Sequence, residues 1–149
     1  ARIRRIPSAD LAHSRVAAAA ARCAAVLGEA ALARELIERS LGVEWNAALV
    51  ELYGDIEKLE AEKRKDEARA RIERAERWLR EHAEDPQLLA TLGRLCMAAE
   101  LWGKAQNYLE ASVSFQPSRA AHLELARLAE REGRAAEAQK HFRRAGELP

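Results

Sequence analysis

The chain has 149 residues, of which 48% are hydrophobic, 5% aromatic and 33% charged, and its formal net charge is +1. Charges of both signs are mixed along the sequence, so no nucleic-acid partner is predicted. Abundant alanine, apolar residues at helical spacing and the lack of period-two alternation predict an all-α fold.

The first segment, residues 1–13, is predicted to be an N-terminal tail and the start of a helix. Its arginines predict a basic, disordered tail: Arg2, Arg4 and Arg5. Residues 14–46 are predicted to form two antiparallel helices joined by a turn. Small and apolar residues recur there at helical spacing: Ala20, Ala21, Ala24, Gly28, Ala33, Ile37 and Ser40.

Residues 47–85 are predicted to form a second, degenerate helix pair with a longer turn. Leu52, Tyr53 and Gly54 mark the centre of its first helix, and its second helix carries Ala68, Ile72 and Ala75. The stretch 57–80 is the most charged part of the chain. Three pairs in it have i,i+4 spacing and predict a solvated helix face: Glu60/Arg64, Glu67/Arg71 and Glu73/Arg77.

Residues 86–118 carry the clearest pattern, and residues 119–149 repeat it. The pattern reads L-x2-L-G-x2-C, then A-x3-L, then proline, on these residues: Leu89, Leu92, Gly93, Cys96, Ala105, Leu109 and Pro117. Its offsets are those of the tetratricopeptide repeat (TPR), W-x2-L-G-x2-Y…A-x3-F…P. The sequence therefore predicts one TPR-type α-solenoid of about four repeats.

Helix boundaries also follow from single residues. Gly28 and Gly133 fit turns between paired helices. Asp85 and Ser118 are predicted N-caps, and Pro86 suits the first turn of a helix.

Four longer strings go beyond general TPR spacing: WNAALVELYG (45–54), AERWLREHAEDPQLLATLGRL (75–95), ELWGKAQNYLEAS (100–112) and ELARLAEREG (124–133). On these strings the chain resembles the C-terminal TPR region of the proteobacterial HemY family. The resemblance implies a parent protein in the bacterial inner membrane, anchored by two N-terminal helices that are absent here. It also implies a soluble repeat region on the cytoplasmic side, associated with late protoheme IX biosynthesis, with haem-biosynthesis enzymes as partners.

The two ends of the sequence predict a piece of a longer protein. The chain opens on Ala1 without an initiator methionine. It ends at Pro149 without a polar capping helix, which a solenoid normally needs.

In TPR proteins the first helix of each repeat usually lines a groove. One inner repeat position, with two neighbouring residues, gives a predicted partner-binding set: Arg22, Asp55, Arg94, Arg127, Arg131 and Met97. Arginine suits bidentate recognition of carboxylates, so an acidic segment of a partner is one possible ligand. The alternative is that these arginines pair with carboxylates of the groove itself: Glu51, Asp55, Glu124 and Glu130.

No catalytic or cofactor motif stands out. The sequence has no phosphate-binding glycine loop, nucleophile elbow or dinucleotide fingerprint, and its four histidines share no metal-ligand spacing. No catalytic residue, metal or cofactor is therefore predicted, and the chain is not expected to be an enzyme. Cys23 and Cys96 lie on apolar helix faces and are predicted to be buried free thiols.

The predicted function is a protein–protein interaction scaffold, the soluble part of a HemY-like membrane protein. One alternative is a tetrapyrrole carrier that uses the arginine groove for haem propionates. Another is an unrelated TPR adaptor. Direct haem ligation is not predicted, because neither His122 nor Cys96 stands in a haem-binding motif.

Overall fold

The computed structural model describes residues 7–149. This part of the chain consists of α-helices joined by irregular connections and contains no strand. The predicted all-α class is therefore confirmed. The helices are α2 (Pro7–Val26), α3 (Ala30–Val43), α4 (Ala47–Tyr53), α5 (Ala61–Trp78), α6 (Pro86–Ala98), α7 (Trp102–Phe115), α8 (Arg119–Arg131) and α9 (Ala135–Gly146). The arginines of the predicted disordered tail lie outside the described residues.

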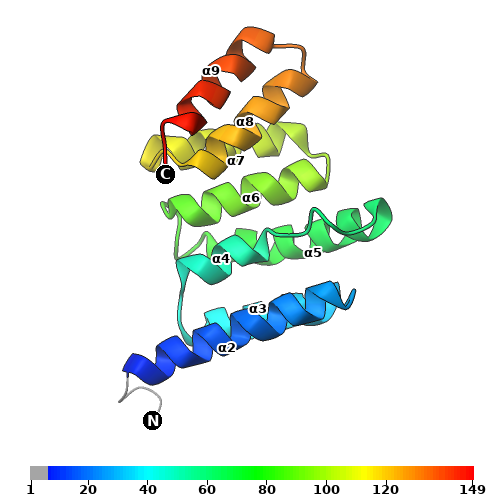
Figure 1. Cartoon of the computed structure of the whole chain (residues 1–149), viewed down its shortest axis with the longest axis vertical. Helices are drawn as coiled ribbons and strands as arrows, with labels where there is room; N and C mark the ends of the chain where they lie inside the picture. The colour runs from blue at the N-terminus through cyan, green and yellow to red at the C-terminus, as the bar shows by residue number, and fades with distance from the viewer. Residues whose placement is uncertain (1–6) are drawn as a thin grey trace.

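The helices form four consecutive pairs that are stacked along the long axis of the molecule, with the first pair, α2 and α3, at one end and the last, α8 and α9, at the other (Figure 1). Within the first, third and fourth pairs, the two helices pack closely against each other. Neighbouring pairs meet through the second helix of one and the first helix of the next, as α3 meets α4 and α7 meets α8. The second pair differs, because α4 packs on α3 and α6 but not closely on α5.

Three of the turns within pairs share one backbone geometry. Gly28 (φ +81°), Glu100 (φ +62°) and Gly133 (φ +75°) occupy the same place in these turns. In each turn the next amide donates a hydrogen bond of 2.8–2.9 Å to the carbonyl five residues earlier. This bond closes the end of a helix around a left-handed residue, which glycine adopts without strain. The predicted glycine turns are confirmed, and Glu100 is a third such position.

The predicted N-caps are also confirmed. The Asp85 side chain accepts hydrogen bonds from the amides of Gln87 and Leu88, and Ser118 accepts one from Ala121. These contacts satisfy donors that have no partner inside the helix. Asn46 caps α4 in the same way through the amide of Leu49.

Small residues allow the paired helices to approach. A Cβ atom added to Gly93 of α6 would lie 2.4 Å from a side-chain carbon of Leu109 in α7, which is fully buried. Ala21 of α2 and Ala126 of α8 stand at the same place in their own helices and are also buried. The crossing of α6 and α7 therefore depends on the absence of a side chain at Gly93.

Helix α2 begins at Pro7, within residues 1–13, where the start of a helix was predicted, and proline suits a first helical turn. One prediction for the first pair is wrong. Cys23 is exposed, although Cys96 is buried as predicted. The residues that correspond to Cys23 in α6 and α8, Leu95 and Leu128, are fully buried, and both helices follow another pair in the stack, whereas α2 is the first described helix.

Candidate functional site

The predicted groove arginines of α6 and α8 already have partners. Nη2 of Arg94 donates to Oε1 of Glu57 at 2.8 Å, and its Nη1 donates to the backbone carbonyl of Glu51 at 3.3 Å. Arg127 forms an ion pair with Glu124, one turn earlier in α8. Of the two interpretations of these arginines, the observed contacts are those of internal pairing. Glu57 was not among the expected partners.

The carboxyl groups near Arg94 and Arg127 have pKa values that are shifted in different directions. Burial opposes the ionisation of Glu57, but the hydrogen bond and charge of Arg94 outweigh it and lower the pKa of Glu57. Burial and the hydrogen bond to Glu57 raise the pKa of Asp55. Burial also raises the pKa of Glu124, although Arg127 and Arg94 act against this. Acidic and basic groups thus lie close together in a mixed-charge strip, which consists of Glu57, Arg94, Glu124 and Arg127.

Two other residues of the predicted set take part in packing. Met97 is half-buried and packs against the main hydrophobic cluster. The Arg131 guanidinium lies over the ring of Trp102, 3.9 Å from its centre, and so joins α8 to the start of α7. This contact is a cation–π interaction between neighbouring pairs.

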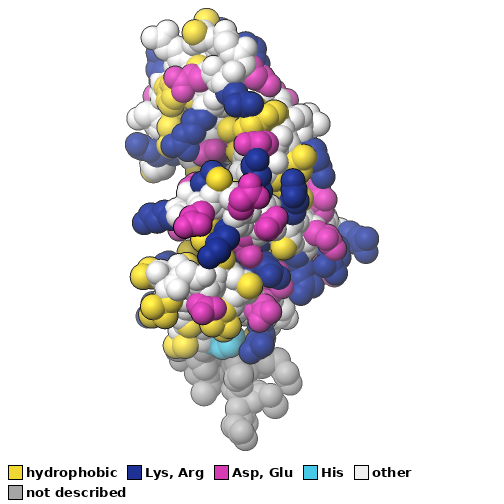
Figure 2. Space-filling view, turned by 90° about the vertical axis from the view of Figure 1, so that its right-hand side faces the viewer, with side chains coloured by type: hydrophobic (Ala, Val, Ile, Leu, Met, Phe, Trp, Pro, Cys, Tyr) yellow, Lys and Arg dark blue, Asp and Glu magenta, His cyan; other side chains and the backbone are white. Residues whose placement is uncertain are grey.

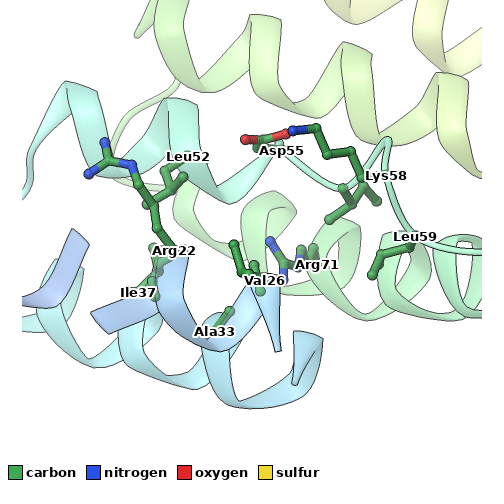
Figure 3. A pocket seen from close by; sticks show the side chains of 12 residues that line it. Arg22, Val26, Ala33, Ile37, Leu52, Asp55, Lys58, Leu59 and Arg71 are labelled. Carbon is green, nitrogen blue, oxygen red and sulfur yellow. The ribbon is translucent and has the colours of Figure 1, made fainter. Parts of the chain in front are cut away.

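The remaining two predicted residues, Arg22 and Asp55, line the same cavity. The cavity has a volume of about 280 Å³ and lies between the first helix pair and the connection from α4 to α5 (Figure 3). Arg94 and Arg127 do not line it. The structure therefore divides the predicted set between this cavity and the mixed-charge strip.

Arg71 is the centre of a buried polar network that was not predicted from the sequence. Its side chain is only 3% exposed. Its Nε donates to Oε1 of Glu67 (3.0 Å), Nη1 to the carbonyl of Tyr53 (2.8 Å) and Nη2 to the carbonyl of Ala30 (3.1 Å). The same oxygen of Glu67 also accepts from Arg34 at 2.7 Å. Arg71 thus ties α5 to the end of α4 and the start of α3.

The prediction of a solvated face was wrong for Glu67/Arg71, since both residues are buried. The signal was present in the sequence: helical spacing places Arg71 on the same face as Ala68, Ile72 and Ala75, which were assigned to the core. Glu73 and Arg77 are exposed, with their charged atoms 4.0 Å apart.

The side chains of Glu60 and Arg64, the first of the three charge pairs, form no ion pair with each other. Instead, Nη1 of Arg64 donates to the carbonyl of Leu59 at 3.1 Å. This contact belongs to the connection before α5, which replaces the short turn of the other pairs.

Tyr53 extends the buried polar network. Its hydroxyl donates to Oε2 of Glu38 at 2.6 Å, and Arg74 pairs with the same carboxylate at 3.3 Å. Burial and the hydrogen bond to Glu38 raise the pKa of Tyr53, so the phenol stays neutral. The network therefore links α3, α4 and α5 through side chains.

His122 and His141 meet between α8 and α9, with their Nδ1 atoms 3.0 Å apart. Burial and the nearby His141 lower the pKa of His122.

Within residues 7–149 no three histidine, cysteine or acidic side chains cluster as metal ligands would. No described helix combines the length and the apolar character that a membrane span requires.

Comparisons with known proteins identified no relative. No family model, curated protein or solved structure matches the chain.

Proposed function

We propose that the chain is a TPR-type α-solenoid that acts as a protein-interaction scaffold. One recurring geometry carries the proposal. In three helix pairs, a buried small residue, Ala21, Gly93 or Ala126, stands seven residues before the left-handed residue of the turn. Helix pairs repeated in this way stack on their neighbours and form extended surfaces, and such surfaces commonly bind other proteins.

The charge distribution supports a polar partner segment. Figure 2 shows acidic and basic side chains interspersed along one side of the stack. On α6 and α8, Arg94 and Arg127 each lie beside a carboxylate, so a partner with acidic groups would compete with Glu57 and Glu124. A segment that carries both signs of charge could satisfy both members of each pair.

The parent protein that we propose is a HemY-like protein of the bacterial inner membrane, with this part on the cytoplasmic side. Its partners would be enzymes of late protoheme IX biosynthesis. The strings at 45–54, 75–95, 100–112 and 124–133 support this proposal.

The test is capture of a partner from native membrane extract by the purified chain. Arg94→Ala/Arg127→Ala should weaken capture about tenfold, since 1.4 kcal/mol corresponds to that factor and charge-assisted contacts reach this size. Arg69→Ala/Arg77→Ala is the matched control, because both arginines are exposed on α5. Equal capture by both double variants, with helicity intact, would show that the arginines do not bind the partner.

The tetrapyrrole-carrier alternative has a separate test. Haem added to the purified chain should change the haem absorbance at a stoichiometric ratio if the chain is a carrier. A scaffold should leave the spectrum without a saturable change.

A further inference from the structure

The cavity beside Arg22 exists because α4 is short. Helix α4 has 7 residues, whereas α6 and α8, the first helices of the next two pairs, have 13 each. The chain leaves the helix at Gly54 and runs irregularly to residue 60. The C-terminal half of α2 therefore faces this connection instead of a continuous helix, and about 280 Å³ remains unfilled between them.

Two arginines donate hydrogen bonds to the C-terminal end of α4. Arg71 donates to the carbonyl of Tyr53 and Arg94 to that of Glu51. Both carbonyls belong to the last turn of α4, where the helix dipole favours positive charge. Helices α5 and α6 thus contact the end of α4 beside the cavity.

The walls of the cavity are mainly apolar. They come from α2, α3, α4 and the connection that follows, and include Ala21, Val26, Ile37, Leu52, Ile56 and Leu59 (Figure 3). Val26 is 86% exposed and stands at the opening, whereas Ile37 and Ile56 are buried. An apolar group that entered from the opening would cover the exposed surface of Val26 and the partly exposed side chains of Leu52 and Leu59.

The charges around the cavity favour an anion. Its lining carries three cations, Arg22, Lys58 and Arg71, and one carboxylate, Asp55. Arg22 and Lys58 are exposed, and none of the ion pairs among residues 13–149 includes them; Lys58 points toward Asp55 (Figure 3). Arg71 shares its only carboxylate partner, Glu67, with Arg34, so this buried cluster keeps a net positive charge. Charges near an apolar, poorly hydrated site act more strongly than in water.

We propose that the cavity binds a small carboxylic acid with an apolar tail, such as a medium-chain fatty acid. The carboxylate lies at the opening, where Arg22 and Lys58 can reach it. The tail lies along Val26, Ile37 and Leu52. Apolar walls with a few polar groups at one end are typical of small-molecule sites. This site does not depend on the proposed scaffold role, because Arg94 and Arg127 do not line it.

The experiment is a titration of the purified chain with octanoate and, separately, with 1-octanol, followed by backbone amide shifts in nuclear magnetic resonance spectra. Octanoate should shift amides of the lining residues of α2, α3 and the 54–60 connection, with an affinity at least fivefold higher than that of octanol. Equal affinities, or shifts confined to other parts of the chain, would overturn the proposal.

Charge variants test the placement of the carboxylate. Arg22→Ala/Lys58→Ala should weaken octanoate binding about tenfold and leave octanol binding unchanged. Val26→Glu should weaken octanoate binding by repulsion at the opening. The matched controls are Arg15→Ala, on the same helix, and Val43→Glu, also at an exposed valine; neither residue lines the cavity. Octanoate affinity that is unchanged by the cavity variants, or reduced equally by the controls, would also overturn the proposal.

Discussion

Single residues set the backbone geometry of the turns, and Glu100 is the strained one. It is the only residue other than glycine with a positive φ in the described part of the chain. A side chain disfavours this conformation by roughly 1–2 kcal/mol. The equivalent positions in two other pairs are occupied by Gly28 and Gly133.

Glu100→Gly should therefore be more stable than Glu100→Ala by about 1 kcal/mol, in the free energy of unfolding from urea titration. Both variants lose the ion pair between Glu100 and Lys65, which is 3.1 Å long and partly exposed, so their difference isolates the backbone. Equal stabilities would mean that the turn relaxes around a side chain without cost.

Arg71 is the residue on which the second pair depends most. Arg71→Ala leaves the carbonyls of Tyr53 and Ala30 without this donor, and it leaves Arg34 as the remaining partner of the Glu67 carboxylate. Removing one member of a buried ion pair costs about 3–5 kcal/mol. Arg69→Ala on the same helix, at a side chain 67% exposed, should change stability by less than about 0.5 kcal/mol. Similar urea midpoints for the two variants would contradict this role.

Between elements, α6 and α7 approach each other closely at Gly93. Gly93→Leu should destabilise the chain by about 1–3 kcal/mol, because the added side chain overlaps Leu109. Gly103→Ala is the matched control, since a Cβ there meets no atom within 4 Å and alanine favours a helix. Calorimetric melting of both variants measures the difference. A Gly93→Leu protein as stable as the parent would place the contact elsewhere.

The histidine pair makes the contact of α8 and α9 sensitive to acid. Because burial and His141 lower the pKa of His122, the folded chain binds fewer protons than the unfolded chain below about pH 6.5. Stability that is complete above this pH should be lost as the pH falls toward the folded-state pKa. The raised pKa of Glu124 acts in the opposite direction, with stability gained as that carboxyl is protonated.

His122→Gln should remove the histidine contribution, so the melting temperature should fall less between pH 7.5 and pH 5.5 than in the parent. His13→Gln, at an exposed position of α2, serves as the control. A parent and a His122→Gln variant with parallel melting curves across this range would rule out the coupling.

For the whole molecule, spacing and caps predicted the helical class and several boundaries. Gly28, Gly133, Asp85 and Ser118 act locally, so their neighbours in sequence are enough to predict them. What sequence patterns missed depends on contacts between distant segments. Cys23 is exposed because no described helix covers its side of α2.

The same limit applies to the two sites. An i,i+4 charge pair such as Glu67/Arg71 has the same spacing on a buried face as on a solvated one. The cavity lies where α4 ends, and that end accepts hydrogen bonds from Arg71 and Arg94, which lie far along the chain. Repeat position placed Arg22 and Asp55 in one predicted binding set, but it did not predict the cavity that both residues line.

The second pair also determines how the stack responds to force. In the other pairs, two helix backbones lie against each other over their lengths, and a pull along the long axis is shared by that contact. Between α4 and α5 the load passes through side chains: Arg71 donates to the Tyr53 carbonyl, and the Tyr53 ring lies 4.9 Å from the ring of Trp78. A hydrogen bond weakens over a few tenths of an ångström, sooner than broad apolar contacts separate. Tension should therefore bend the molecule first at this seam, and the neighbouring cavity would change shape before either end of the stack does.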